Sequence, residues 1–368
     1  MAGPADAAAP SPTPSRLRRR RLLALTFLGG AALVALSPLL SGVSIPSTTV
    51  FRILANGLSF GGLYPSPCDA GVSATQCSAW VRIIWQSTVP TILLALLAGA
   101  ALGLSGATLQ GTFRNPLADP YLLGLSSGGT LGAAILFVFN VGLAQANVAL
   151  PLFAFFGAIA TGGLILLSAR YLGGSVETLL LVGVALANLL SAILSVILLF
   201  NPTGSAQVSF WLLGGLGGAT WGRDGIVLGG LLLATGPLLL LGRELNVLQL
   251  GSDVAQSLGV DARRIRTRLL LLASVATAVA VAFTGIIGFV GLISPHVVRR
   301  VWGPDYRAVL PGSALVGATF LLAAHDLSGL VVPDVVLPVG LFTAFAGAPF
   351  FFFLLLRHRR GAFMGEGL

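Results

Sequence analysis

The sequence has few charged residues and no lysine. Only 9% of its 368 residues are charged, whereas a soluble globular domain carries about 25%. This shortage excludes a soluble enzyme, a nucleic-acid-binding protein and a disordered scaffold, even though the formal net charge is +9. All 21 basic residues are arginines, and a Walker A loop needs a lysine on the nucleotide phosphates. If ATP drives this protein, a separate subunit must hydrolyse it.

Residues that bind metals or act as nucleophiles are also scarce. The three histidines, His296, His325 and His358, are far apart in the sequence. The chain contains no H-E-x-x-H or Cys-x-x-Cys pattern, which zinc proteases and many metal centres use. We therefore expect no catalytic residue, no metal site and no cofactor.

The sequence is instead rich in apolar residues, which make up 55% of the chain with a mean hydropathy of +0.94. At roughly 20 residues per crossing, this amount is enough for about ten transmembrane helices. The fold class predicted is therefore an all-α polytopic membrane protein. The apolar blocks place the spans at residues 22–40, 89–110, 121–142, 148–169, 178–200, 225–242, 267–283, 284–301, 309–325 and 335–356.

The arginines predict the orientation of these spans. Residues 1–21 form a basic tail without apolar periodicity, which we expect to be disordered. A cleaved signal peptide is the alternative, but the apolar run that follows is longer than a signal core. With ten spans in residues 22–357, 18 of the 21 arginines fall on the side of the N-terminus. By the positive-inside rule, both termini, including the tail 358–368, are cytoplasmic, and the protein lies in the plasma (bacterial inner) membrane.

The two cysteines lie together in the predicted outer loop, residues 41–83. Cys68 and Cys77 are nine positions apart on the oxidising face of the membrane, where a disulfide could form. Two unpaired thiols are the alternative.

Four polar or glycine-rich phrases interrupt the apolar pattern. The first runs from Leu104 to Gly124 and contains two turn signals, Asn115-Pro116 and Asp119-Pro120. The second, residues 245–259, predicts a short helix that ends at Gly259 and could meet a soluble partner. The third is GFVGLISPHVVRR, with Pro295 and His296, and the fourth begins with Pro338 and Gly340.

In this order, the phrases resemble the FecCD family, the permease subunits of ABC importers for iron–siderophores, haem and cobalamin. The resemblance runs from about residue 89 to 357. It implies a ten-helix type II importer fold that forms a homodimer. It also implies two copies of a separate ATPase, an extracytoplasmic substrate-binding protein and a metal-chelate ligand.

The resemblance assigns roles by position. It places ATPase coupling in the segment 243–266, at Gly251, Asp253, Ala255, Leu258 and Gly259. It implies a cytoplasmic gate at Gly174, Ser175, Val176 and Glu177. The translocation path would follow along Leu181, Gly183, Ala185, Asn188 and Ser191.

The sequence departs from the family pattern on its predicted outer side. Thr88 and Thr91 stand where the family usually has two arginines that face the binding protein. Arg52 and Arg82 lie nearby in the sequence and could substitute. Asp326 is retained from the family's A-D-x-x-A-R phrase, while its arginine is missing.

An ion-coupled secondary transporter of a small organic solute is the alternative function. It would need acidic residues within the membrane, and the candidates are Asp326 and Glu177. Asp326 could equally make a structural hydrogen bond to a neighbouring helix end, and Asp119 is expected to cap a turn.

Overall fold

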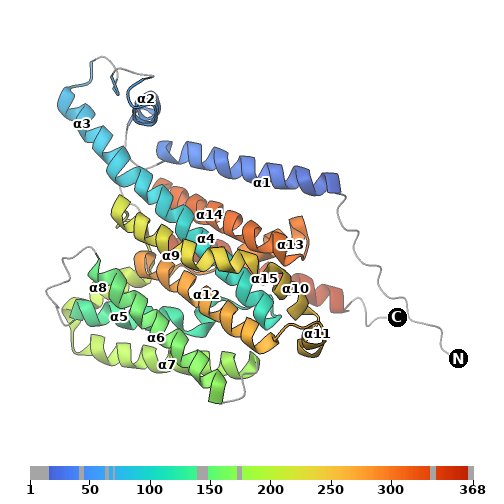
Figure 1. Ribbon diagram of the computed structural model, residues 1–368. Helices are drawn as coiled ribbons and strands as arrows, with labels where there is room; N and C mark the ends of the chain where they lie inside the picture. Colours follow the sequence, from blue (N-terminus) through green and yellow to red (C-terminus); the bar gives the residue numbers. More distant parts are fainter. Residues whose placement is uncertain are drawn as a thin grey trace.

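The computed structural model describes residues 16–40, 45–62, 66–68, 71–138, 148–171, 176–331 and 337–363. Within these ranges the chain is helical and contains no strand, which confirms the predicted fold class. The longer helices run side by side in a bundle (Figure 1). The elements are α1 (Arg16–Leu36), η1 (Ser37–Leu39), α2 (Ser47–Leu58), α3 (Ala74–Ile83), η2 (Ile84–Thr88), α4 (Val89–Phe113), η3 (Pro120–Leu123), α5 (Leu125–Val138), α6 (Ala149–Tyr171), α7 (Val176–Leu199), α8 (Pro202–Leu212), α9 (Trp221–Leu240), α10 (Gly242–Gln249), α11 (Ser252–Ser257), α12 (Ala262–Thr284), α13 (Val290–Trp302), α14 (Tyr306–Leu330) and α15 (Val339–Phe363).

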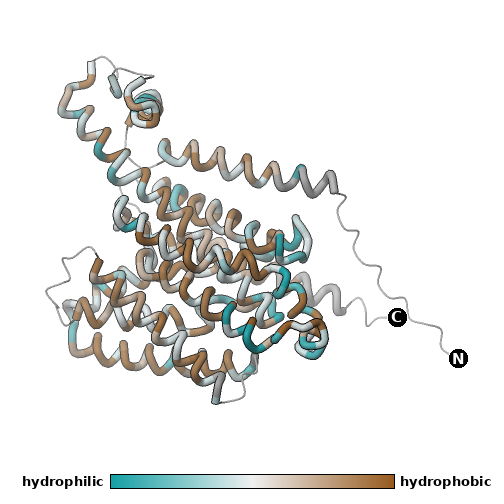
Figure 2. The backbone as a smooth tube through the Cα atoms, in the orientation of Figure 1, coloured by the Kyte–Doolittle hydropathy of each residue, from teal (hydrophilic) through white to brown (hydrophobic). Residues whose placement is uncertain are grey.

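Among the described residues, six helices are long and apolar enough to cross a membrane. They include residues 74–113, 149–168, 177–199, 221–240, 262–284 and 306–330. Three shorter apolar helices cover 24–39, 125–138 and 339–353. Figure 2 shows the apolar colour along the bundle and hydrophilic segments gathered near α10 and α11. The beginning of α1, the end of α15 and the α10–α11 pair lie at the same end of the molecule (Figure 1).

Helix α4 forms the centre of the bundle and packs against α9, α12, α13 and α14. Small residues make this packing close. A side chain at Gly99 or Gly103 would collide with the backbone of α14 at Gly317 or Ser313, and one at Gly106 would collide with the backbone of α13. Without a hydrophobic driving force between helices in lipid, such close backbone contact is a main source of helix association.

Two sequence predictions differ from the structure. The start of the span expected at 284–301 is wrong, because α12 ends at Thr284 and the second helix of this region, α13, begins only at Val290. The predicted outer loop 41–83 contains α2 and α3, and α3 continues through the π-helical turn η2 into α4. The helices α8 and α10 were not anticipated from the apolar pattern.

Candidate functional site

The predicted coupling segment folds as two short helices, α10 and α11, at one end of the bundle. Gly251 connects them at φ +109°, and Gly259 follows α11 at φ +79°. These left-handed values favour glycine, because a Cβ atom is strained there. The N–H of Gly259 donates to the carbonyl of Gln256 at 3.0 Å, so the predicted end of the helix at Gly259 is confirmed.

One face of the α10–α11 pair is anchored in the bundle. Leu245, Leu248 and Ala255 are buried in a cluster that includes Leu269 of α12 and Leu310 of α14. The guanidinium of Arg266 on α12 also donates to the Ser252 hydroxyl at 2.9 Å. Apolar packing and a hydrogen bond therefore hold the α10–α11 pair to the long helices α12 and α14.

The opposite face exposes apolar side chains. Leu250, Val254 and Leu258 are 62%, 44% and 59% exposed. Val254 and Leu258 lie four residues apart at α11 and its C-cap, and Leu250 is the C-cap of α10. Asp253 is exposed beside them. A group of exposed apolar residues on a polar end of a protein is typical of a partner-binding surface. We call Leu250, Asp253, Val254 and Leu258 the α11 surface.

A polar contact fixes α10 to the start of α14. The amide of Asn246 donates to Asp305 Oδ1 at 2.8 Å and accepts the N–H of Tyr306 at 2.9 Å. Arg307 forms an ion pair with Asp305 at 3.1 Å. The hydrogen bond from Arg307, together with that from Asn246, lowers the pKa of the Asp305 carboxyl to about 2.

Pro295 creates a gap in the hydrogen bonding of α13, and a side chain of α4 fills it. Proline has no N–H, so the carbonyl of Gly291, four residues earlier, lacks its helical donor. Gln110 is buried, and its Nε2 donates to that carbonyl at 3.1 Å. The Arg299 guanidinium in turn donates to Gln110 Oε1. Gln110, from the first of the four sequence phrases, therefore supplies the hydrogen-bond donor that Pro295 in the third phrase lacks.

Residues 285–289, which connect α12 to α13, are not helical and form a break inside the bundle. Gly285 has φ +68° and Phe289 φ +67°. Both polar backbone groups of Ile287 pair with one hydroxyl: Tyr121 Oη donates to its carbonyl at 2.7 Å and accepts its N–H at 3.0 Å. Non-helical backbone inside a membrane needs such internal partners because no water replaces them.

Two other connections contact this break: the one between α8 and α9, and the one that leads into α15. The N–H of Gly215 donates to the carbonyl of Thr284 at 2.8 Å. A side chain at Gly214 would collide with the carbonyl of Ile286, and one at Gly340 with that of Leu213. The start of α15, where Pro338 and Gly340 lie, is therefore packed directly on the break between α12 and α13.

Helix α7, predicted to line the path, is the least covered long helix among the described residues. Only 6% of its apolar window is buried within the chain, compared with 78% for the window containing α4. Leu181, Ala185, Asn188 and Ser191 are exposed, while Gly183 is buried. The structure thus brings four of the five predicted path residues to an open surface.

The predicted gate lies at the beginning of α7. Gly174 and Ser175 lie outside the described residues, and Val176 is the first residue of the helix. Glu177 is exposed in the first helical turn, where a negative charge interacts favourably with the helix dipole.

The turn between α4 and α5 has the chemistry expected from its sequence. Asn115 Oδ1 accepts the N–H of Leu117 at 2.9 Å. Asp119 caps η3, because its Oδ1 accepts the N–H of Tyr121 at 2.8 Å; Pro120 begins η3. Pro116 lies exposed between these two residues. The expectation that Asp119 caps a turn is confirmed, and the cap also positions Tyr121 at the break.

The predicted docking residues lie on the opposite end of the bundle from α11. Arg82 is exposed in α3, and Arg52 is partly buried in α2. Thr88 is buried and Thr91 partly buried, and both line a cavity together with His325, Asp326 and Pro338. Neither Arg52 nor Arg82 lines this cavity, which the threonines share with the predicted acid, although Arg82 is on the same continuous α3–η2–α4 helix.

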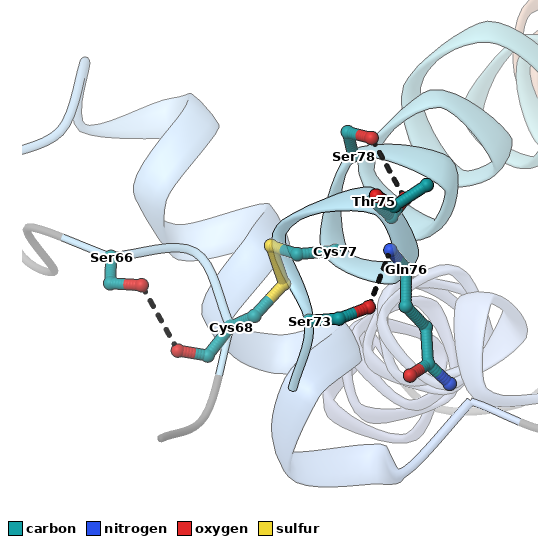
Figure 3. Close-up of a disulfide and its surroundings, with 7 residues drawn as sticks. All are labelled: Ser66, Cys68, Ser73, Thr75, Gln76, Cys77 and Ser78. Atoms are coloured by element: carbon teal, nitrogen blue, oxygen red, sulfur yellow. Dashed lines mark hydrogen bonds between the residues drawn. A yellow bond between two sulfur atoms is a disulfide. The ribbon is translucent and has the colours of Figure 1, made fainter. Parts of the chain in front are cut away.

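A disulfide between Cys68 and Cys77 joins the segment 66–68 to α3 (Figure 3). The Ser73 hydroxyl caps α3 by accepting the N–H of Gln76 at 3.2 Å. Val50 and Ile53 of α2 pack with Cys68 in a small separate apolar cluster. We call α2, α3 and the disulfide the outer cap.

No group of three histidine, cysteine or acidic side chains could hold a metal ion within the part of the chain that the structure describes. His296 instead packs edge-on against the ring of Phe350, with 5.7 Å between the ring centres.

Sequence reasoning missed several of these residues. Tyr121, Asn246 and Asp305 were not selected, since each acts on a backbone or side-chain group far away in the sequence. One signal was available in the sequence. Pro295 within a predicted helix leaves the carbonyl of Gly291 without its helical donor, which indicates that a polar side chain such as Gln110 must pair with it.

Apolar helices long enough to cross a membrane, with non-helical breaks whose backbone groups are paired inside the bundle, are typical of a multi-pass membrane transporter. The sequence model of the FecCD transport family matches residues 22–357, and the chain belongs to this family. It is a permease subunit of an ABC importer.

Relatives support this assignment across most of the chain. An uncharacterized ABC transporter permease protein of Bacillus subtilis is 38% identical, covering 94% of this chain and 97% of its own length. A hemin transport system permease protein of Yersinia pestis is 42% identical over 75% of this chain and 84% of its own. A cobalamin import system permease protein of Halobacterium salinarum is 39% identical over 94% and 90%.

A solved structure shares the fold. It is described as an inward-facing conformation of a metal-chelate type ABC transporter and superimposes with a TM-score of 0.76 at 29% identity. The match covers 92% of this chain and 99% of that one.

Proposed function

We propose that this permease imports a metal chelate, such as an iron–siderophore, haem or cobalamin, into the cytoplasm. The names of the hemin and cobalamin relatives support this class of cargo. The chemistry of α7 agrees with it. Its exposed side chains are apolar or neutral beyond Glu177, whereas a bare Fe³⁺ ion would need several carboxylates. A chelate presents an organic surface instead.

Two copies of the chain form the path in this proposal, each with ten spans and both termini in the cytoplasm. The uncovered face of α7 supports the pairing, because a second copy would cover it and enclose the path. The arginines support the orientation, since the α10–α11 end carries Arg243, Arg263, Arg264 and Arg266.

Two separate ATPase subunits dock on the two α11 surfaces, and an extracytoplasmic binding protein delivers the cargo. The permease itself performs no covalent chemistry. Closure of the ATPase pair on ATP pushes residues 251–259, and the buried anchors Leu248 and Ala255 pass the push to α12 and α14. The gate at residues 174–177 opens as the bundle changes between two states.

The α11 surface is the observation that carries this proposal. Leu258→Asp places a charge on its exposed apolar side and should abolish ATPase binding and ATP-driven uptake. Asp253→Arg should act in the same direction through its reversed charge. Uptake of hemin, cobalamin and a ferric siderophore is measured in proteoliposomes, and ATPase binding by co-purification.

Leu58→Asp is the matched control, because Leu58 is 74% exposed in the outer cap. It should leave ATPase binding unchanged. Normal co-purification and normal uptake with Leu258→Asp would contradict the coupling role of α11.

A further inference from the structure

A cavity of about 310 Å³ lies between helix ends distant from α11, and none of its lining residues belongs to α10 or α11. It opens where η1, the start of α4, α14 and the start of α15 meet. The lining residues that matter here are Ser37, Thr88, Thr91, His325, Asp326 and Pro338. No residue of α7 lines it, so this cavity is distinct from the proposed path.

Asp326 offers an unused acceptor in this cavity. Its residue is only 5% exposed, and its Oδ1 accepts the Ser37 hydroxyl at 2.6 Å. Its buried Oδ2 has no hydrogen-bond partner among the described residues. A buried carboxylate with a vacant oxygen is costly unless a cation or a donor pairs with it. The site is therefore chemically incomplete in the single chain.

The other lining groups favour a cation of a particular kind. His325 Nδ1 is buried and also lacks a partner among the described residues, and Ser87, Thr88 and Thr91 contribute hydroxyls. No arginine lines the cavity. A metal such as Ca²⁺ takes six or more oxygen ligands, mostly carboxylates and carbonyls, and here there is one carboxylate. A guanidinium or ammonium group on a flexible side chain needs one carboxylate and several hydroxyls.

We propose that this cavity receives a basic side chain, arginine or lysine, of the extracytoplasmic binding protein, which pairs with Asp326. This inference rests on the proposed function. The threonines at positions 88 and 91 keep the cavity free of positive charge, so it accepts a cation from outside. Docking therefore uses an acidic permease site and a basic partner side chain on this face.

Two substitutions test the pairing in the complete permease–ATPase complex in nanodiscs, titrated with the binding protein of the same importer. Asp326→Asn keeps the shape and removes the charge, and should weaken binding about tenfold or more. Thr91→Arg supplies a guanidinium from within the chain, and should weaken binding similarly. The affinity of the unchanged complex should fall as NaCl is raised, and that of Asp326→Asn should fall less.

The matched control is Asp224→Asn, which removes a buried carboxyl in the first turn of α9 outside the cavity. It should leave the affinity unchanged. If Asp326→Asn does not assemble, Thr91→Arg decides the question alone.

The outcomes separate this inference from the proposed function. Weaker binding of Asp326→Asn or Thr91→Arg, with Asp224→Asn unchanged, supports the inference. Unaltered affinity in both cavity variants overturns it and leaves the importer assignment standing, because the unchanged complex still binds its partner. A complex that neither binds a binding protein nor takes up a chelate overturns both.

Discussion

Replacing Tyr121 by phenylalanine tests whether one hydroxyl stabilises the break between α12 and α13. The substitution keeps the ring and removes only the oxygen that pairs with both backbone groups of Ile287, at 2.7 and 3.0 Å. Ile287 is fully buried. Its N–H and carbonyl then have no replacement partner in an apolar surrounding, so the folded state loses two hydrogen bonds at once.

The magnitude follows from those two bonds. Hydrogen bonds between membrane helices contribute about 0.6 kcal/mol on average and up to about 1.7 kcal/mol. A buried group left unpaired costs about 1–3 kcal/mol in soluble proteins. We expect Tyr121→Phe to lower the free energy of unfolding by about 1–3 kcal/mol, which is roughly a 5- to 160-fold change in the unfolding equilibrium.

Reversible unfolding by dodecyl sulfate in mixed micelles measures this difference. Tyr171→Phe is the matched control, because Tyr171 is 78% exposed at the end of α6 and surface changes usually stay within about 0.5 kcal/mol. An unfolding free energy for Tyr121→Phe equal to that of the control would refute the assigned role of the hydroxyl.

Three further predictions concern other parts of the molecule. Gly103→Val should destabilise the bundle by about 1–3 kcal/mol in the same unfolding assay, because its side chain collides with the backbone of α14, whereas Gly163→Val, with open space around it, should not. Cys68→Ser should increase proteolysis and hydrogen exchange within the outer cap only, since the lost cross-link contributes about 2–3 kcal/mol to that local fold; unchanged exchange there would contradict this. Asp305→Asn should destabilise the protein equally at pH 7 and pH 5, and the difference should shrink below about pH 4. The folded carboxyl has its pKa lowered to about 2, so its ion pair with Arg307 stabilises the fold above the ordinary aspartate pKa and is lost as the pH falls through 2; a difference that already shrinks between pH 7 and 5 would be incompatible with it.

The spans and the end of α11 could be predicted from the sequence because their signals are local. An apolar run of about 20 residues has the length that a helix needs to cross the bilayer. Gly259, after a short polar helix, has the residue type that a left-handed C-terminal position needs. Both signals act within a few residues of the element that they determine.

The break at residues 285–289 could not be predicted in the same way. Residues 267–301 are apolar almost throughout, so hydropathy divided them into two adjacent spans at residues 283 and 284 but did not show the non-helical segment between the helices. The break is stable because Tyr121, more than 160 positions away, pairs with Ile287. Hydropathy also misjudged the outer cap, since prolines and cysteines there indicated a loop while Val50 and Ile53 formed the apolar side of a helix.

The site was predictable in parts. The α11 surface comes from one short segment, so Asp253 and Leu258 could be chosen in advance, whereas Leu250 and Val254 were not selected. The outer cavity is different, because Ser37 and Asp326 are 289 positions apart and only the packing of η1 on α14 brings them together. The sequence identified Asp326 as an unusual acid but contained no signal for the pocket around it.

The hydrogen bond from Gln110 to Gly291 sets a limit on how this permease can move during transport. Sliding of α13 along α4 by one helical turn would leave the Gly291 carbonyl without the donor that Gln110 supplies, in a bundle interior where an unpaired backbone group is costly. We therefore expect α4 and α13 to move together through the transport cycle.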